Sequence, residues 1–140
     1  MFATPDAAEH AFYEALEQAD PVRLMQVWAD EEDIVCIHPD GLRAIGHDAV
    51  QESWMNILAR GPVHLRPLQL KVMSSMMCAV HVLVEQTVAP MGHGRTVQNT
   101  YATNVYHKGP AGWRMVMHHA SLAPAEAVEH EMRDVPTRLH

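Results

Sequence analysis

The chain has 140 residues, of which 17 are Asp or Glu and 10 are Lys or Arg, so its formal net charge is −7 at pH 7. This length predicts one domain with a single core, and an acidic chain without a basic cluster argues against nucleic acid as a partner. No stretch approaches the roughly 18 consecutive apolar residues that a membrane helix requires, and no basic segment precedes an apolar one at the start. We therefore expect a cytoplasmic protein without a membrane partner.

Cysteine and histidine usage bears on metal binding. The two Cys residues lie in apolar, strand-like runs, which predicts free thiols in a reducing compartment. Eleven His residues raise the question of a metal, but the chain contains no H-E-x-x-H, H-x-H or C-x-x-C spacing. Adjacent His118 and His119 would point to opposite faces of a strand. A metal site built from distant residues such as His38, His81 and His118 is the minor alternative, so we expect no metal and no cofactor.

The N-terminal part predicts two helices. Thr4 is an N-cap followed by Pro5, and apolar residues then recur at helical spacing for about four turns. Asp20 and Pro21 repeat this signal and begin a second, shorter helix. Tyr13 lies beside the apolar stripe of the first helix, and two alternatives are open for its hydroxyl, namely contact with water or contact with a ligand.

Two short strands and a third helix come next. Residues 34–38 predict a compact buried strand that ends at His38, and residues 42–45 predict its hairpin partner. Gly46 leads into a helix whose apolar face includes Trp54 and which ends before Pro62.

The periodicity then changes to two, which predicts four consecutive strands. On the second of them, residues 77–89, His81, Leu83 and Glu85 share one face. Residues 97–122 predict a long hairpin around a Gly- and Pro-containing turn, with His107 opposite Trp113. The polar segment after residue 122 is expected to be helical over residues 125–132.

This order of elements predicts the fold class. Helices are segregated from a meandering antiparallel sheet, which is an α+β arrangement. We expect a curved antiparallel sheet wrapped over the N-terminal helices, forming a cone with an internal pocket.

With these elements in place, the chain resembles the SnoaL-like members of the nuclear transport factor 2-like superfamily, whose fold is a cystatin-like cone. The residues that carry the resemblance are VCIHP at 35–39, GHDAVQESW at 46–54, TNVY at 103–106 and GWRMVMHHAS at 112–121. The likeness covers about residues 5–122 of a single domain over residues 1–140, with 123–140 as a tail. The superfamily includes ketosteroid isomerases, polyketide cyclases, dehydratases and a kinase association domain, so the resemblance implies a fold and leaves the function open.

The resemblance also implies that one face of the sheet lines the pocket and the other face forms a subunit contact. Polar pocket groups of relatives tend to lie where this chain has Leu83, Asn104 and Ala120, which selects the face that also carries Glu85 and His118. The opposite face is then expected to form a homodimer, through Val105, Trp113, Met115, Met117 and His119.

Two functional hypotheses remain. The first is a pocket for a small organic molecule, with apolar walls that include Val116. Its ligand-binding residues are expected to be Tyr13, Trp28, Trp54, His81, Leu83, Asn104 and Tyr106.

The second hypothesis is an isomerase, cyclase or lyase that uses His acid-base chemistry on a carbonyl compound, without a metal or organic cofactor. Its candidate catalytic residues are His118, His38 and Glu85. A His would act as the base, and Glu85 would orient it or act itself if burial raises its pKa. A non-catalytic dimerisation module is a third, less favoured alternative.

Overall fold

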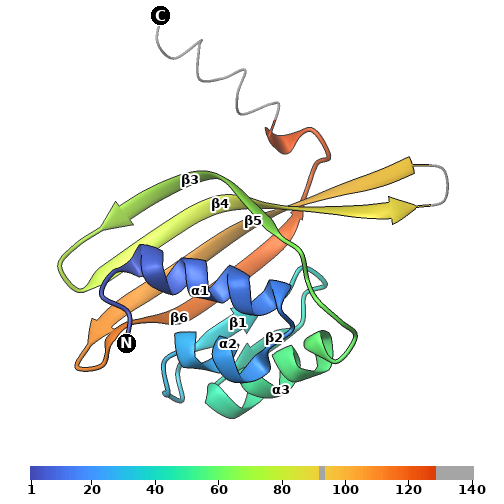
Figure 1. The fold of residues 1–140 in the computed structure, drawn as a ribbon. Coiled ribbons are helices and arrows are strands. Elements are labelled where there is room, and N and C mark those ends of the chain that lie inside the picture. Colours follow the sequence, from blue (N-terminus) through green and yellow to red (C-terminus); the bar gives the residue numbers. More distant parts are fainter. Residues whose placement is uncertain (92–93, 129–140) are drawn as a thin grey trace, which may run out of the picture.

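The structure is a computed structural model that describes residues 1–91 and 94–128, without the side chains of residues 88–96. Its elements follow the predicted order of helix, helix, hairpin, helix and four strands (Figure 1). The helices are α1 (Pro5–Glu17), α2 (Pro21–Val27) and α3 (His47–Leu58). The strands are β1 (Val35–Ile37), β2 (Arg43–Ile45), β3 (Arg66–Ser74), β4 (Cys78–Met91), β5 (Gly94–Gly109) and β6 (Gly112–Ala123).

Both predicted helix starts are confirmed by their capping bonds. The Thr4 hydroxyl accepts a hydrogen bond from the Ala7 backbone N–H at 3.0 Å, and the Asp20 carboxylate accepts one from the Arg23 N–H at 3.1 Å. Each cap satisfies a backbone donor that the first turn of a helix leaves without a partner. The predicted tail helix at 125–132 extends beyond the described residues, which end at residue 128.

The six strands form one sheet in the order β2-β1-β6-β5-β4-β3. The four long strands make the predicted antiparallel meander. The short hairpin joins the same sheet, because β1 pairs with β6 in parallel, with Cys36 beside His118. The sheet was expected to be antiparallel, but it is mixed, because the pairing of β1 with β6 is parallel. This pairing brings residues from the first third of the chain next to the last strand.

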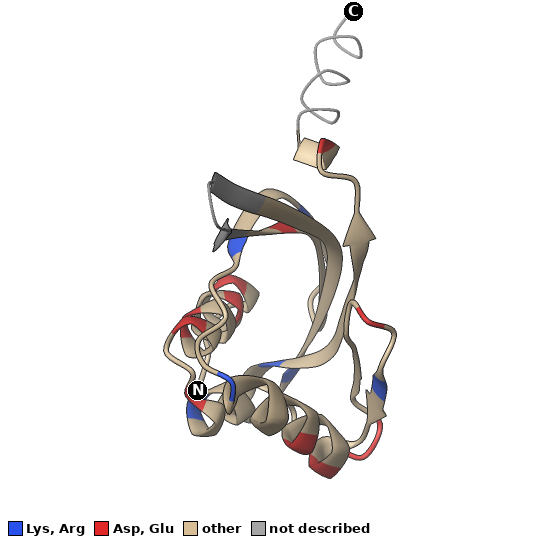
Figure 2. Ribbon diagram, turned by 90° about the vertical axis from the view of Figure 1, so that its right-hand side faces the viewer, with Lys and Arg blue, Asp and Glu red and all other residues tan. Residues whose placement is uncertain are grey.

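The sheet curves around the helices, which all lie on its concave side (Figure 2). The core fills the space between them, and its largest fully buried side chains include Phe12, Leu16, Leu24, Trp28 and Met115. This is the predicted α+β cone. Among the described residues, no helix is long and apolar enough to cross a membrane.

The β5–β6 hairpin differs from its predicted register. Lys108, and not His107, lies opposite Trp113. The pairing shifts again farther along the strands, because β6 contains an extra residue, Val116, that has no partner on β5. Such a β-bulge reverses the alternation of inward and outward side chains.

Because of the bulge, some residues that were predicted to form the dimer surface do not lie on the outer face of the sheet. Trp113 and Met115 are 8% and 0% exposed and belong to the core, so they do not lie on the outer face as predicted. Beyond the bulge the alternation agrees with the prediction: His118 is buried on the inner face, and His119 is exposed. Val105 and Met117 are half-buried partners on the outer face.

Candidate functional site

One cavity of about 200 Å³ is lined by α3, the end of β1 and three long strands. Its apolar walls consist of Pro39, Trp54, Ile57, Val63 and Leu65. Its polar lining consists of His38, Glu85, Thr87, Gln98, Thr100 and His118. Apolar walls with a few polar groups are typical of small-molecule sites, but this volume is below the roughly 300 Å³ at which such sites usually begin. The cavity therefore suits a small ligand.

Strand pairing brings three titratable side chains to this cavity. Cys36 lies beside His118 in the β1–β6 pair, and His38 follows two residues later on the same side. Glu85 comes from β4, which is separated from β6 by β5 alone. The exposed fractions of His38, Glu85 and His118 are 4%, 2% and 2%. All three predicted catalytic residues thus line one cavity, although they are far apart in the sequence.

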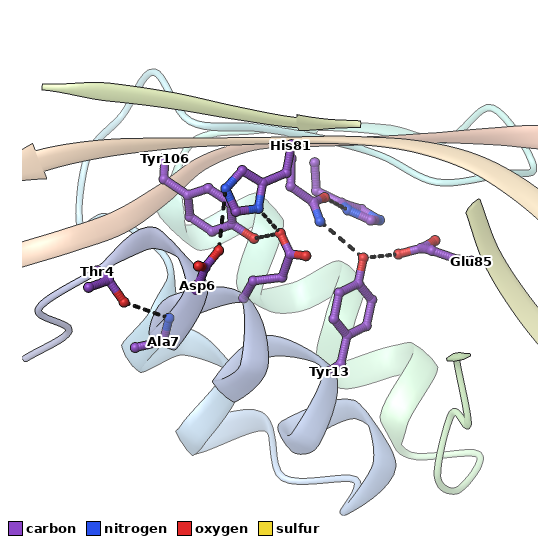
Figure 3. Close-up of polar contacts among 10 residues, drawn as sticks. Thr4, Asp6, Ala7, Tyr13, His81, Glu85 and Tyr106 are labelled. Atoms are coloured by element: carbon purple, nitrogen blue, oxygen red, sulfur yellow. Dashed lines mark hydrogen bonds and ion pairs between the residues drawn. The ribbon is translucent and has the colours of Figure 1, made fainter. Parts of the chain in front are cut away.

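A continuous hydrogen-bond chain links Glu85 to His118 behind the cavity. Tyr13 Oη donates to Glu85 Oε2 at 2.7 Å and accepts from Asn104 Nδ2 at 3.0 Å. Asn104 Oδ1 lies 2.6 Å from His118 Nδ1. Thr100 Oγ1 donates to the second carboxylate oxygen of Glu85 at 3.1 Å. Figure 3 shows Tyr13 reaching from α1 to Glu85, so that α1 supplies the middle of this chain.

His38 is held in place by α3. Its Nε2 lies 3.1 Å from Ser53 Oγ, and the Ser53 hydroxyl donates to the Val50 carbonyl at 2.9 Å. The same nitrogen lies 3.6 Å from Cys36 Sγ, so two side chains fix the position of the ring. The imidazole also packs edge-on against Trp54, with the ring centroids 4.8 Å apart.

Burial shifts the protonation of all three groups toward the neutral form. Burial lowers the pKa of His118 to about 3, and His119 adds to this effect. Burial, followed by the charge that His118 would carry, also lowers the pKa of His38. Burial raises the pKa of Glu85, although hydrogen bonds from Tyr13 and Thr100 oppose the shift. The cavity therefore holds neutral imidazoles beside a carboxyl group that takes up a proton more readily than usual.

Glu9, His81 and Tyr106 form a second buried polar cluster, which does not line the cavity. Figure 3 shows His81 and Tyr106 next to each other on the side of the sheet that faces α1. Glu9 Oε2 accepts a hydrogen bond from Tyr106 Oη at 2.9 Å and is also hydrogen-bonded to His81 Nδ1. The His81 and Tyr106 rings meet edge-on at 5.0 Å. These contacts join α1 to β4 and β5. His81 and Tyr106, which the sequence suggested as ligand-binding residues, thus hold the helix on the sheet.

The other predicted ligand-binding residues do not all lie at the cavity. Trp54 lines the cavity, whereas Tyr13 and Asn104 lie behind it in the hydrogen-bond chain. Trp28 and Leu83 are 0% and 2% exposed in the core and do not line this cavity, so the structure does not bring them together with Trp54. The reason is that both pack between the helices and the sheet, where the apolar content is greatest.

Val116 was also expected in the apolar wall of the pocket, but it does not line this cavity. As the bulge residue of β6 it lines a different hollow, beside Arg114 and the β5–β6 turn. The bulge turns its side chain away from the cavity.

Several cavity residues were missed from the sequence. Thr100 and Gln98 share the face of Asn104 on β5 by period-two spacing, and this signal was available. Val63 and Leu65 lie in the segment between α3 and β3, whose path is not evident from the sequence. Glu9, in the second cluster and outside the cavity, was also missed, although it lies four residues before Tyr13 and therefore on the same helix face.

The described residues contain no group of three or more His, Cys, Asp or Glu side chains placed to hold a metal ion. The distant set of His38, His81 and His118 is also divided by the fold. His38 and His118 line the cavity, and His81 is bonded to Glu9 in the second cluster. The candidate site is therefore an arrangement of hydrogen-bonding and acid-base groups.

Comparison with protein families identifies the fold family. A family model described as a SnoaL-like domain matches residues 6–126. The chain belongs to the SnoaL-like family. The resemblance predicted from the sequence is thereby confirmed for most of the length of the chain. No curated protein matches this SnoaL-like chain.

Solved structures agree with this assignment. A protein from Thiobacillus denitrificans that bears the name of a calcium/calmodulin-dependent protein kinase type II association domain is 32% identical, with a TM-score of 0.76 over 89% of this chain and 98% of the other. A nuclear transport factor 2-like protein from Streptomyces avermitilis that bears the name of a dehydratase is 26% identical, with a TM-score of 0.73 over 86% and 99%. The hub domain of the same kinase type from S. rosetta is 18% identical, with a TM-score of 0.70 over 88% and 100%, and shows the fold alone.

Proposed function

We propose that this SnoaL-like chain binds a small, uncharged organic molecule in the cavity lined by His38, Glu85 and His118. The observation that carries the proposal is the convergence of these three buried polar groups on one cavity whose other walls are largely apolar. Each of the three groups already has a hydrogen-bond partner within the protein, and a ligand inside the cavity would meet the capacity that remains. Among the described residues that line it, none is Lys or Arg, and these residues offer a permanent anion no fixed counter-charge.

The cavity volume limits the size of this ligand. A volume of about 200 Å³ corresponds to the space of about seven water molecules at ~30 Å³ each. A ring of five or six atoms with one or two oxygen substituents is of this size, whereas a steroid or a polyketide is far larger. The proposed ligand is therefore a compound of this size, with a carbonyl or hydroxyl group that can meet the buried polar side chains.

Binding is tested with protein purified from its host and with a panel of compounds. Native mass spectrometry is expected to show a co-purified small molecule, and NMR titration with uncharged carbonyl and hydroxy compounds is expected to shift the signals of cavity residues. His118→Gln is expected to weaken binding, whereas His119→Gln, a change at the exposed neighbour, is a matched control that leaves binding intact. If no compound of this size moves cavity signals in wild-type protein, the binding proposal fails.

We also propose a second candidate function, proton transfer of the isomerase or lyase type. It is favoured by the presence of Glu85 and His118 on the same cavity and by the Streptomyces avermitilis relative, which is named as a dehydratase. Glu85, whose pKa is raised by burial, is the group suited to take and return a proton at neutral pH. His118 remains neutral and accepts a hydrogen bond, so Glu85 takes the role that the sequence analysis gave first to a His.

Turnover of the same panel tests the enzymatic proposal. General acid-base groups contribute about 10²- to 10⁴-fold to a rate, so Glu85→Gln is expected to reduce kcat by at least about 100-fold. Glu9→Gln removes a buried carboxylate from the neighbouring cluster and is the matched control. Equal activity of wild type and Glu85→Gln would exclude this carboxylate as the proton-transfer group.

A homodimer through the outer sheet face is proposed with a corrected set of residues, namely Val105, Met117 and His119. Two relatives that bear the name of a kinase association or hub domain support assembly through this fold, which also keeps a dimerisation module among the alternatives. Apolar side chains exposed on the same face, such as Val82, support it physically. Light scattering at micromolar concentration tests this proposal, and a monomer contradicts it.

A cytoplasmic location is proposed from the two cysteines. Cys36 is buried and Cys78 is half-buried, and both are free thiols. Unpaired thiols are the usual state in a reducing compartment. Fractionation of the host cell, with detection of the protein in the extract, tests the location.

A further inference from the structure

The hydrogen-bond chain between Glu85 and His118 has a direction. Tyr13 Oη and Thr100 Oγ1 both donate to Glu85, one to each carboxylate oxygen, so this end of the chain is an acceptor. Tyr13 has one hydrogen, and once it is donated to Glu85 its oxygen can only accept from Asn104. The nitrogen of the Asn104 amide must therefore face Tyr13, at 3.0 Å, and its oxygen must face His118, at 2.6 Å.

This direction determines where the proton of His118 resides. The Asn104 oxygen is an acceptor only, so His118 Nδ1 carries a hydrogen and donates it. Burial lowers the pKa of His118 to about 3, and the ring therefore has one proton at neutral pH. Its second nitrogen, Nε2, is left with a lone pair. No hydrogen bond to Nε2 is found within the described part of the chain, and the ring lines the cavity.

We propose that Tyr13 and Asn104 are positioning residues that hold His118 in its Nδ1–H tautomer, and that the cavity thereby selects ligands that donate a hydrogen bond to Nε2. The ligand class, which rests on the proposed function, is a small uncharged hydroxy compound whose hydroxyl group lies at His118. An isolated carbonyl oxygen is disfavoured there, because it would face the lone pair of Nε2.

His38 has the opposite tautomer. When the Ser53 hydroxyl donates to the Val50 carbonyl, its oxygen accepts from His38, and Nε2 of His38 is then the protonated nitrogen. The two cavity imidazoles are thus expected to give different signals in the same spectrum, with the proton on Nε2 in His38 and on Nδ1 in His118. His38 is an internal reference for the assignment.

The tautomers are measured by long-range proton–nitrogen NMR on protein with ¹⁵N-labelled histidine at pH 7. His118→Gln identifies the signals of His118. The expected result is a protonated Nδ1 and an unprotonated Nε2 in wild type. Finding the proton of His118 on Nε2 would overturn the proposal, because the chain would then run in the other direction.

Two Tyr→Phe variants distinguish positioning from a merely structural role. Tyr13→Phe removes the acceptor that orients the Asn104 amide, so His118 is expected to change to a mixture of tautomers. Tyr101→Phe removes a hydroxyl from an exposed position of the neighbouring strand β5 and is expected to leave the His118 tautomer unchanged. An unchanged tautomer in a folded Tyr13→Phe variant would overturn the proposal.

Ligand selection is measured with two probes of equal size, cyclohexanol and cyclohexanone. Wild type is expected to bind the alcohol about fivefold more tightly, which is the range of one hydrogen bond, and Tyr13→Phe is expected to lose this preference. Equal binding, or a preference for the ketone, would overturn the ligand class. If neither probe binds, the proposed binding function is wrong. The tautomer spectrum tests the role of Tyr13 and Asn104 independently of that result.

Discussion

Tyr13 on α1 and Glu85 on β4 are joined by a 2.7 Å hydrogen bond across 72 residues of sequence. Both side chains are buried, with 8% and 2% of their surface exposed. Burial of Tyr13, followed by the charge of Glu85, raises the pKa of the phenol, so the hydroxyl remains protonated and continues to donate. Together with the contacts of Glu9, this bond docks α1 on the sheet, and it also orients the groups that line the cavity.

Tyr13→Phe is expected to destabilise the protein. The change leaves Glu85 with one donor fewer and leaves Asn104 Nδ2 without its acceptor, and each buried group left without a partner costs about 1–3 kcal/mol. Chemical denaturation measures the loss of unfolding free energy. Tyr101→Phe, at a residue that is 39% exposed, is the control and is expected to change little. Equal stability of the two variants would show that the contact is not stabilising.

Stability is expected to fall on acidification because of His118. Its pKa is about 3 in the folded protein, below the value of 6.5 for an unperturbed imidazole, so the unfolded chain binds a proton first as the pH decreases. Between pH 6.5 and pH 3 this residue should therefore reduce the free energy of unfolding by roughly 1.4 kcal/mol per pH unit. Above pH 6.5 its contribution is constant.

A comparison of variants isolates this effect from other titrating groups. Glu85 has the opposite sign, since its raised pKa lets the folded state take up a proton first on acidification, and it offsets part of the loss. His118→Gln keeps the contribution of Glu85 and should show a weaker loss between pH 6 and pH 4 than wild type. Parallel curves for wild type and His118→Gln would contradict the prediction.

Two glycines of the β5–β6 turn are expected to differ in their tolerance of Ala. Gly112 has φ +89°, and a Cβ there would lie 2.6 Å from the Phe2 carbonyl oxygen, whereas a Cβ at Gly109 meets no atom within 4 Å. Gly112→Ala should lower the unfolding free energy by about 1–3 kcal/mol, because it adds backbone strain and a clash. Thermal unfolding measures the difference. The prediction fails if Gly109→Ala is equally harmful.

Leu83→Ala and Ile57→Ala should differ in their effects on stability and on ligand affinity, because one residue lies in the core and the other lines the cavity. Leu83 is 2% exposed in the core, so its truncation is expected to cost about 2–5 kcal/mol of stability and to leave ligand affinity unchanged. Ile57 lines the cavity, so its truncation should weaken ligand binding with a smaller loss of stability. Denaturation and NMR titration measure the two quantities. Loss of affinity in Leu83→Ala alone would reverse the assignment of the two residues.

Met117→Lys is expected to dissociate the proposed dimer. Met117 lies opposite Val105 on the outer face, and a charge placed there would be buried without a partner in a subunit contact. Light scattering should show a monomer for this variant. Met55→Lys adds the same charge at an exposed position of α3 and should leave the mass unchanged. If Met117→Lys remains a dimer, the interface does not include Met117.

Local signals in the sequence were sufficient for most of the fold. The caps at Thr4 and Asp20, the period of two on β4 and the Gly-containing turn before β6 are each decided by a few neighbouring residues. The same period placed Glu85 on the inner face correctly. The bulge at Val116 carries no such signal, and it moved Trp113 and Met115 from the predicted outer face into the core.

The sequence by itself determined the helices, the long strands and the candidate acid-base residues His38, Glu85 and His118, because backbone propensity and side-chain periodicity are properties of short segments. Only the tertiary structure decided which of these residues meet. The parallel β1–β6 pair brings His38 to His118, and the docking of α1 connects Glu85 to His118 through Tyr13 and Asn104. Hydrogen bonds act over about 3 Å in space, and no pattern within a single segment specifies which distant side chain will lie at that distance.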